Sequence, residues 1–92
     1  MHLEIVSPEA VLYTGDATAV TVPGIDGEFQ MLDKHAPIVS LLAEGTVKIK
    51  GASINEKQKK HFATGKDAGE ILLKINSGTL EMNDNKIIIL AD

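Results

Sequence analysis

The sequence predicts an all-β protein, with residues 1–92 forming one antiparallel β-sandwich or flattened barrel of eight to ten short strands. Turn-forming residues interrupt the chain every few positions, which leaves segments too short for ordinary helices. Six valines and ten isoleucines favour sheet, because β-branched side chains fit a pleated surface. Apolar and polar residues also alternate along several segments, as expected of strands with one buried face.

Each expected strand shows this pattern in its own residues. One polar residue stands between two apolar ones in each of the segments Leu3–Ile5, Val20–Val22 and Val47–Ile49. Leu80–Met82 does the same, and after the turn at 83–86 comes the apolar run Ile87–Leu90. These last two segments predict a hairpin whose second strand is paired centrally or buried on both faces.

Residues 51–69 depart from the pattern, because they are polar, rich in lysine and without clear period. We expect a long polar excursion from the sheet here. Residues 56–60 are good helix formers and predict at most one helical turn, since few apolar residues are present to anchor a longer helix.

Composition excludes several classes of function. Nine lysines against 13 acidic residues give a net charge of −4, and there is no arginine, which argues against nucleic acids and anionic membranes as partners. The absence of cysteine excludes disulfides and thiolate chemistry. No apolar run is long enough to span a bilayer, and we expect a cytosolic protein or one attached to something that is not cytosolic.

The sequence also lacks recognisable catalytic or cofactor motifs. His2, His35 and His61 have no spacing typical of a metal site. Residues 24–27 lack the length and the lysine of a phosphate-binding loop, and none of the serines lies in the glycine frame of a nucleophile elbow. The residues therefore give no positive indication of a catalytic, cofactor or metal site.

Residues 22–37 have two interpretations. On the simpler one they form a hairpin with ordinary loops, in which glycines allow the tight turn and Phe29 and Met31 fill the core. On the other they carry a family signature. The stretch Pro23–Phe29 reads Pro-Gly-Ile-Asp-Gly-Glu-Phe, and Lys34–Pro37 reads Lys-His-Ala-Pro.

These two stretches resemble the N-terminal domain of the F-type ATP synthase epsilon subunit, which carries Pro-Gly-x-x-Gly-Glu-Phe/Leu followed by Gly-His-Ala-Pro. The resemblance extends over residues 1–50 and 75–92, and it includes Leu3–Glu9, the Tyr13–Gly15 corner, Gly45–Ile49 and the final Leu-Ala-Asp. The chain departs from the pattern at Lys34, where the family has glycine, and at residues 76–79. Its excursion at 51–69 is longer and more basic than the corresponding hairpin of the family.

The resemblance implies a ten-stranded sandwich that acts without catalysis in the central stalk, the rotor of the ATP synthase. Its implied partners are the gamma subunit and the c-subunit ring, with the alpha3beta3 head reached only indirectly. It implies a peripheral position on the cytoplasmic face of the bacterial inner membrane, held there only by the complex, and a role in coupling proton translocation to ATP synthesis.

We expect contacts at two places. Glu28, with Asp26 and Phe29 beside it, is the candidate for contact with the c-ring, because acidic side chains pair with basic or amide groups. Candidates for contact with a bottom loop or with gamma are His35, Ala36, Pro37, Ile38, Leu41 and Leu42. A subunit that belongs to a complex should also expose an apolar patch, and the expected residues are Ile38, Val39, Leu41 and Leu42.

Most members of the family continue past Leu-Ala-Asp into a helical hairpin that restrains ATP hydrolysis. This sequence stops at Asp92, so we expect no such domain and no such restraint. Two other functions stay open. A free-standing β-sandwich binding module would show a concave pocket with converging polar groups, and a small hydrolase would need a nucleophile and base that no motif marks.

Overall fold

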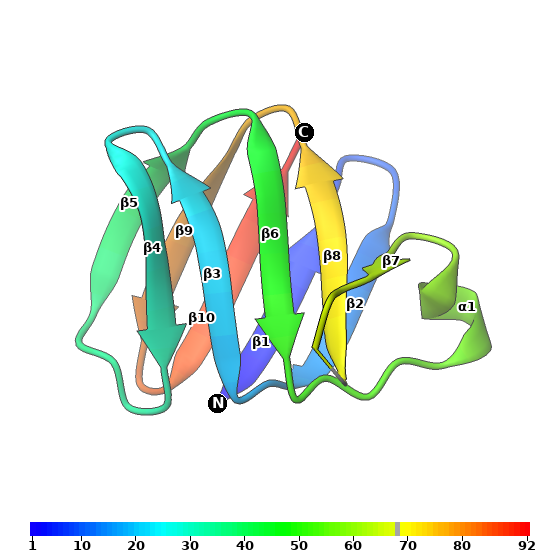
Figure 1. Ribbon diagram of the computed structural model, residues 1–92. Helices are drawn as coiled ribbons and strands as arrows, with labels where there is room; N and C mark the ends of the chain where they lie inside the picture. Colours follow the sequence, from blue (N-terminus) through cyan, green and yellow to red (C-terminus); the bar gives the residue numbers. More distant parts are fainter. Residues whose placement is uncertain (68) are drawn as a thin grey trace.

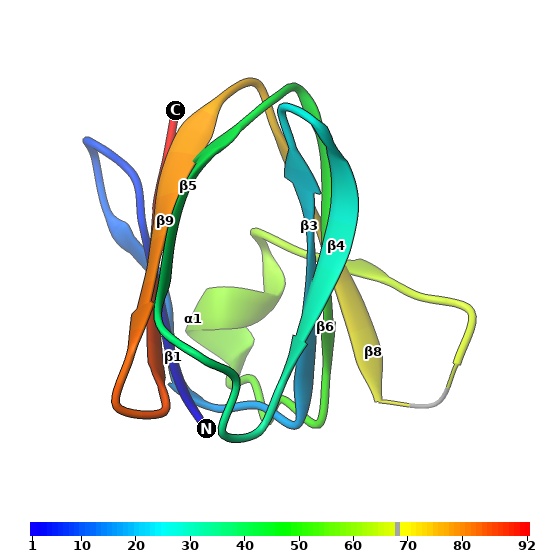
Figure 2. The same ribbon diagram turned by 90° about the vertical axis from the view of Figure 1, so that its left-hand side faces the viewer.

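The computed structural model describes residues 1–67 and 69–92 and shows two layers of strands packed face to face (Figures 1 and 2). The strands and one short helix follow in the order β1 (His2–Val6), β2 (Val11–Asp16), β3 (Ala19–Gly24), β4 (Gly27–Leu32), β5 (Ile38–Leu42), β6 (Gly45–Lys50), α1 (Glu56–Lys59), β7 (Ala63–Thr64), β8 (Glu70–Ile75), β9 (Gly78–Asn83) and β10 (Lys86–Ala91). The predicted all-β sandwich is confirmed.

Hydrogen-bonded pairing defines the two layers. The back layer of Figure 1 has the order β2-β1-β10-β9-β5, and the front layer contains β4, β3, β6, β8 and β7. The layers join at one end, where Gly24 of β3 pairs with Leu42 of β5. This pairing makes the two layers one continuous sheet, which curls into a half-barrel instead of forming two separate sheets.

One pair departs from the antiparallel prediction. β1 and β10 lie side by side in parallel, with Leu3 opposite Ile87 and Ile5 opposite Ile89. Each of these strands is antiparallel to its other neighbour, β2 and β9 respectively, so the first and last strands of the chain meet running the same way. The side-chain alternation is identical for either direction of pairing, so it carried no signal of this.

The predicted hairpin of β9 and β10 is confirmed, and β10 is central in its layer. Asp84 and Asn85 both have positive φ, of 49° and 59°, which matches the primed turn that follows the twist of a two-stranded hairpin. Burial on both faces is not what β10 shows, because Leu90 is 53 % exposed on the outer side while Ile87 and Ile89 point inward.

The core lies between the layers and is built by the alternating residues. Side chains of Leu3, Ile5, Val20, Val22, Met31, Val47, Ile49, Leu80, Met82, Ile87 and Ile89 are fully buried there. Among the described residues no charged or polar side chain is buried with them. Met31 confirms the expected core role, whereas Phe29 is only half-buried at the edge of the same cluster.

The excursion at 51–69 closes one end of the sandwich. Its single helical turn is α1, capped by Asn55, whose side chain accepts from the Gln58 amide at 2.9 Å while the Gln58 side chain accepts from the Asn55 amide at 3.0 Å. No residue of α1 is buried, but Ile54 and Phe62 on either side of it pack against the core. Figure 2 shows the helix between the far ends of the two layers.

Candidate functional site

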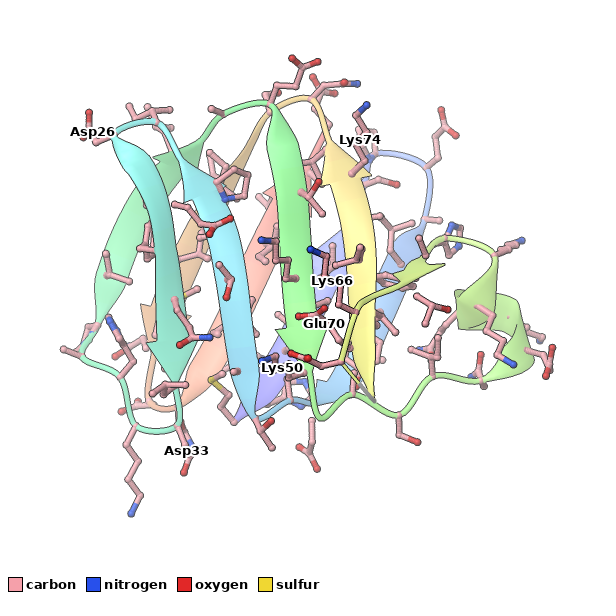
Figure 3. The ribbon with its side chains drawn as sticks, in the orientation of Figure 1. Asp26, Asp33, Lys50, Lys66, Glu70 and Lys74 are labelled. Carbon is pink, nitrogen blue, oxygen red and sulfur yellow. The ribbon has the colours of Figure 1, made fainter. Side chains whose placement is uncertain are left out.

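The β3–β4 hairpin presents the candidate c-ring residues at one end of the sandwich. Pairing of Gly24 with Gly27 leaves a two-residue loop, which places Asp26 at its exposed tip (Figure 3). Glu28 is also exposed, but its carboxylate lies 3.4 Å from Lys48 Nζ, so part of its charge is balanced within the chain. Asp26 therefore presents the more available negative charge at the tip.

Phe29 supports this tip from inside. A Cβ atom added at Gly24 would lie 2.8 Å from both Phe29 Cε1 and the carbonyl oxygen of Gly27, so the phenyl ring lies directly against the backbone of the neighbouring strand. Only glycine leaves room for this packing. The half-buried ring packs against the core cluster, and its role as a contact residue stays a prediction.

The His35-Ala36-Pro37 loop lies at the opposite end of the hairpin. It follows Asp33, which Figure 3 places at the other end of β4 from Asp26. His35 is half-buried and bonds locally, with its Nδ1 2.7 Å from the carbonyl oxygen of Ala36. The loop and the tip thus lie at opposite ends of the hairpin, whereas Leu41 lies beside the tip, because its carbonyl oxygen accepts from the Ile25 amide at 3.2 Å.

Asp33 ties three chain segments together beside this loop. Its Oδ1 accepts hydrogen bonds from the Asn85 side-chain amide at 2.8 Å and from the Met1 ammonium group at 3.0 Å. Asn85 Oδ1 in turn accepts from the backbone amide of Lys34 at 2.7 Å. The Asn85 hydrogen bond, followed by the Met1 ammonium, holds the pKa of Asp33 below its usual range.

The candidates on β5 divide between the two faces of the strand. Leu41 is 58 % exposed and Val39 is 78 % exposed on the outer face of the back layer. Leu42 is 3 % exposed and belongs to the core, and it also lines the apolar depression beside Leu41, so its role in a contact stays a prediction. Ile38 is half-buried against the core cluster.

An apolar groove of about 640 Å³ runs beside Leu41 on the outer face of the back layer. We use the name apolar groove for the surface whose principal lining residues are Val6, Pro8, Ile25, Leu41 and Leu90. Ser77, Thr79 and Asp92 add polar groups to its lining. It draws on β1, β5, β9, β10 and the β3–β4 tip, so segments far apart in sequence build it.

Of the apolar residues that line the groove, sequence analysis identified Leu41 and Leu42. Leu90 was hidden in the apolar run of β10, which reads as core. Ile25 gave a usable signal, because a large apolar residue in a two-residue turn is unusual unless something covers it. No local sequence signal marked Val6 or Pro8, since their place in the groove depends on the pairing of β1 with β10.

The described residues offer no arrangement for catalysis or metal binding. They contain no group of three or more histidine, aspartate or glutamate side chains placed to hold a metal ion. His2 lies on an outer face, 3.4 Å from Glu4 Oε1. None of the described helices has the length and apolar character needed to cross a membrane.

The family model of the ATP synthase delta/epsilon chain beta-sandwich domain matches residues 1–92. The chain belongs to this family. The resemblance inferred from the hairpin signature is thereby confirmed.

Relatives and solved structures agree with this membership. The ATP synthase epsilon chain of Campylobacter concisus is 36 % identical over 92 residues, which are 100 % of this chain and 60 % of the relative. That of a Sulfurovum species is 37 % identical, also over 100 % of this chain and over 61 % of its own length. The chain thus spans about three fifths of the curated relatives it matches.

Two solved assemblies contain chains of the same fold. A chain of the Tetrahymena thermophila mitochondrial ATP synthase central stalk and c-ring superposes with a TM-score of 0.68 at 17 % identity, covering 98 % of this chain and 61 % of that one. A chain of the Euglena gracilis mitochondrial ATP synthase gives 0.72 at 18 % identity, covering 97 % and 48 %. At this identity the likeness shows the fold alone.

Proposed function

We propose that this chain is a non-catalytic part of the ATP synthase central stalk that bridges the gamma subunit and the c-ring and so couples proton translocation to ATP synthesis. In this proposal the apolar groove takes the gamma subunit and the β3–β4 tip takes the polar loops of the c-ring. The chain would lie at the cytoplasmic face of the bacterial inner membrane, attached only through the complex and contacting the alpha3beta3 head indirectly.

The apolar groove carries the proposal for gamma. Leu41 and Leu90 are each more than half exposed on a sheet face that otherwise alternates regularly, and they line one continuous depression. Exposed apolar surface of this kind marks sites of protein association. Val39 continues it along β5 toward Pro37, so we extend the proposed gamma contact to Ile38 and to the His35-Ala36-Pro37 loop.

The tip carries the proposal for the c-ring. Ile25 lines the groove while the adjacent Asp26 stands at the exposed tip, so the two proposed contacts adjoin at one end of a two-layered sandwich. Such a strand-rich wedge transmits force with little bending. Acidic groups at the tip would pair with basic or amide groups on the c-ring loops.

Mixing the purified chain with gamma on a sizing column tests the first contact. Leu41→Ser/Leu90→Ser should weaken binding at least about tenfold, because two large apolar contacts are lost from the interface. The matched control is Val11→Ser/Leu32→Ser, which changes two comparably exposed residues outside the groove and should bind normally. Equal binding by both variants, or no binding by the unaltered chain, contradicts the proposal and favours a free-standing module.

Cysteine cross-linking tests the second contact. Asp26→Cys should cross-link to a cysteine in a c-ring loop, and Glu28→Cys should do so less, because position 28 lies within β4 while position 26 lies in the exposed loop. His35→Cys serves as the control because it lies toward the opposite end of the hairpin. Cross-linking from position 35 but not from 26 or 28 would reverse the proposed orientation. Unchanged coupling of ATP hydrolysis to proton pumping in Asp26→Asn and Glu28→Gln would argue against any role for the tip.

A further inference from the structure

The lysines of this acidic chain are gathered on one part of the molecule. Residues 45–75 hold seven of the nine lysines but only three of the 13 acidic residues, so this stretch carries a net charge of +4 and the rest of the chain −8. These residues form β6, α1, β7, β8 and the connections between them. We call their lysine-bearing surface the basic face; its lysines are Lys48, Lys50, Lys57, Lys59, Lys60, Lys66 and Lys74.

The sheet pattern fixes the direction of the strand lysines. Val47 and Ile49 of β6 point into the core, so Lys48 and Lys50 point outward from the front layer. On β8, Leu73 and Ile75 are buried, which turns Lys74 to the same outer side (Figure 3). The basic face therefore lies on the front layer and the adjoining end of the sandwich, away from the apolar groove on the back layer.

The segment between β6 and β8 is held against the body of the protein. Asp67 pairs with Lys50 at 3.0 Å and raises the pKa of that lysine, and Glu70 Oε1 accepts from the backbone amide of Lys66 at 3.0 Å. At the far side of α1 the ring of Phe62 packs on Tyr13. Its lysines thus project from an anchored segment, which lowers the entropy lost when a partner binds.

Among the described residues, only some of these lysines pair with a carboxylate of this chain. Lys48, Lys50 and Lys59 each lie within 4.0 Å of a carboxylate of this chain. Among the described residues, no carboxylate oxygen lies within that distance of Nζ of Lys57, Lys60, Lys66 or Lys74. The face therefore keeps an excess of positive charge after its internal ion pairs are counted.

We propose that the basic face is a second docking surface, distinct from the apolar groove, and that it takes an acidic segment of another protein subunit. The face mixes free lysines with the carboxylates of Glu28, Asp67 and Glu70. This mixed pattern suits a protein surface of complementary charges, whereas a uniformly anionic bilayer would repel the carboxylates. Nucleic acid is disfavoured because the face offers neither arginine nor an exposed aromatic side chain for stacking.

The first test uses the isolated chain and a glutamate oligomer as the acidic probe. Backbone amide shifts should move on β6, on β8 and around α1, and binding should weaken steeply with added salt. Lys66→Gln/Lys74→Gln should weaken binding at least about fivefold, while Lys34→Gln/Lys86→Gln should change it less than about twofold. Both variants take the net charge from −4 to −6, so the comparison isolates position from total charge.

Two outcomes would overturn the proposal at this stage. Equal weakening by the two variants, or shifts spread evenly over the surface, would mean that only total charge matters. Binding to vesicles containing phosphatidylserine through the same lysines, without binding to the glutamate oligomer, would assign the face to lipid instead.

The second test uses the assembled complex and a carbodiimide, which joins a lysine amine directly to a carboxylate in contact with it. The pairs Lys50–Asp67 and Lys48–Glu28 provide internal positive controls at 3.0 and 3.4 Å. Peptide mapping should find Lys57, Lys60, Lys66 or Lys74 joined to an acidic residue of another subunit. Formation of the internal links alone would overturn the proposal without affecting the proposed contact between the apolar groove and gamma.

Discussion

The ring of Phe62 meets the ring of Tyr13 edge-on, with their centroids 6.3 Å apart and their planes at 88°. This contact fastens the polar excursion to a core residue of β2, and aromatic pairs in such geometry contribute beyond their buried area. Because Phe62 is only half-buried, Phe62→Ala should lower the free energy of unfolding by about 2 kcal/mol. Urea denaturation followed by circular dichroism measures this.

A conservative variant separates ring geometry from simple burial. Phe62→Leu keeps most of the apolar area and should recover at least half of the loss. If Phe62→Ala were as stable as the unaltered chain, the excursion would not be anchored through this ring and the rigidity argued for the basic face would be lost.

Deprotonation of Tyr13 should lower the stability of the fold at alkaline pH. Burial raises the pKa of its hydroxyl above the ordinary value of 10.0, and that hydroxyl donates to the carbonyl oxygen of Asp16 at 2.6 Å. The unfolded chain therefore loses this proton at a lower pH than the folded chain, so stability falls as pH rises above 10.0. Tyr13 is the single tyrosine and there is no tryptophan, so phenolate absorbance reports it directly.

The matching variant is Tyr13→Phe. It lacks the hydrogen bond to Asp16, and its stability should be lower at neutral pH but should lose this tyrosine-dependent decline above pH 10. Phenolate absorbance that rises at the ordinary tyrosine pKa, before any unfolding, would show that the hydroxyl is not protected.

Protonation of Asp33 should lower the stability of the fold in acid. Its pKa is lowered from 3.8 by the Asn85 amide and the Met1 ammonium, so the folded state binds this proton less readily than the unfolded state. Its contribution is fully present above pH 3.8 and disappears as pH falls through the lowered pKa. The stability advantage of the unaltered chain over Asp33→Asn should therefore shrink in acid, as urea midpoints measured across that range would show. An advantage independent of pH would mean that the contacts do not depend on the charge.

Local patterns predicted the strands because they need only neighbouring residues. The alternation at Val20–Val22 and Val47–Ile49 follows directly from one buried face, and the turn at Asp84 and Asn85 requires residues that tolerate positive φ. The helical turn at Glu56–Lys59 was also accessible, since Asn55 and Gln58 have the spacing of a capping box.

Features that depend on distant pairing were not accessible in the same way. Nothing near Leu3 or Ile87 specifies that these strands meet in parallel, because either direction buries the same side chains. The apolar groove could not be predicted from local sequence for the same reason, since it brings Val6 together with Leu90 and Leu41. The family signature located the β3–β4 tip. The difference between Glu28 and Asp26 became visible only in the structure, where Glu28 pairs with Lys48.

The close packing around Gly24 leaves no room for a side chain at the hairpin tip. A methyl group there would come within 2.8 Å of both the Gly27 carbonyl oxygen and the Phe29 ring, so Gly24→Ala should lower the free energy of unfolding by about 1–3 kcal/mol and displace the tip that carries Asp26. Phe29→Leu removes one of the two obstacles, so the double variant should be more stable than the sum of the single changes predicts. The backbone obstacle at Gly27 would remain, so rescue should be partial, and amide shifts of Asp26 should stay displaced. Strict additivity in this cycle would mean that ring and backbone do not touch, and the tip would then lack the rigidity that contact with a rotating partner requires.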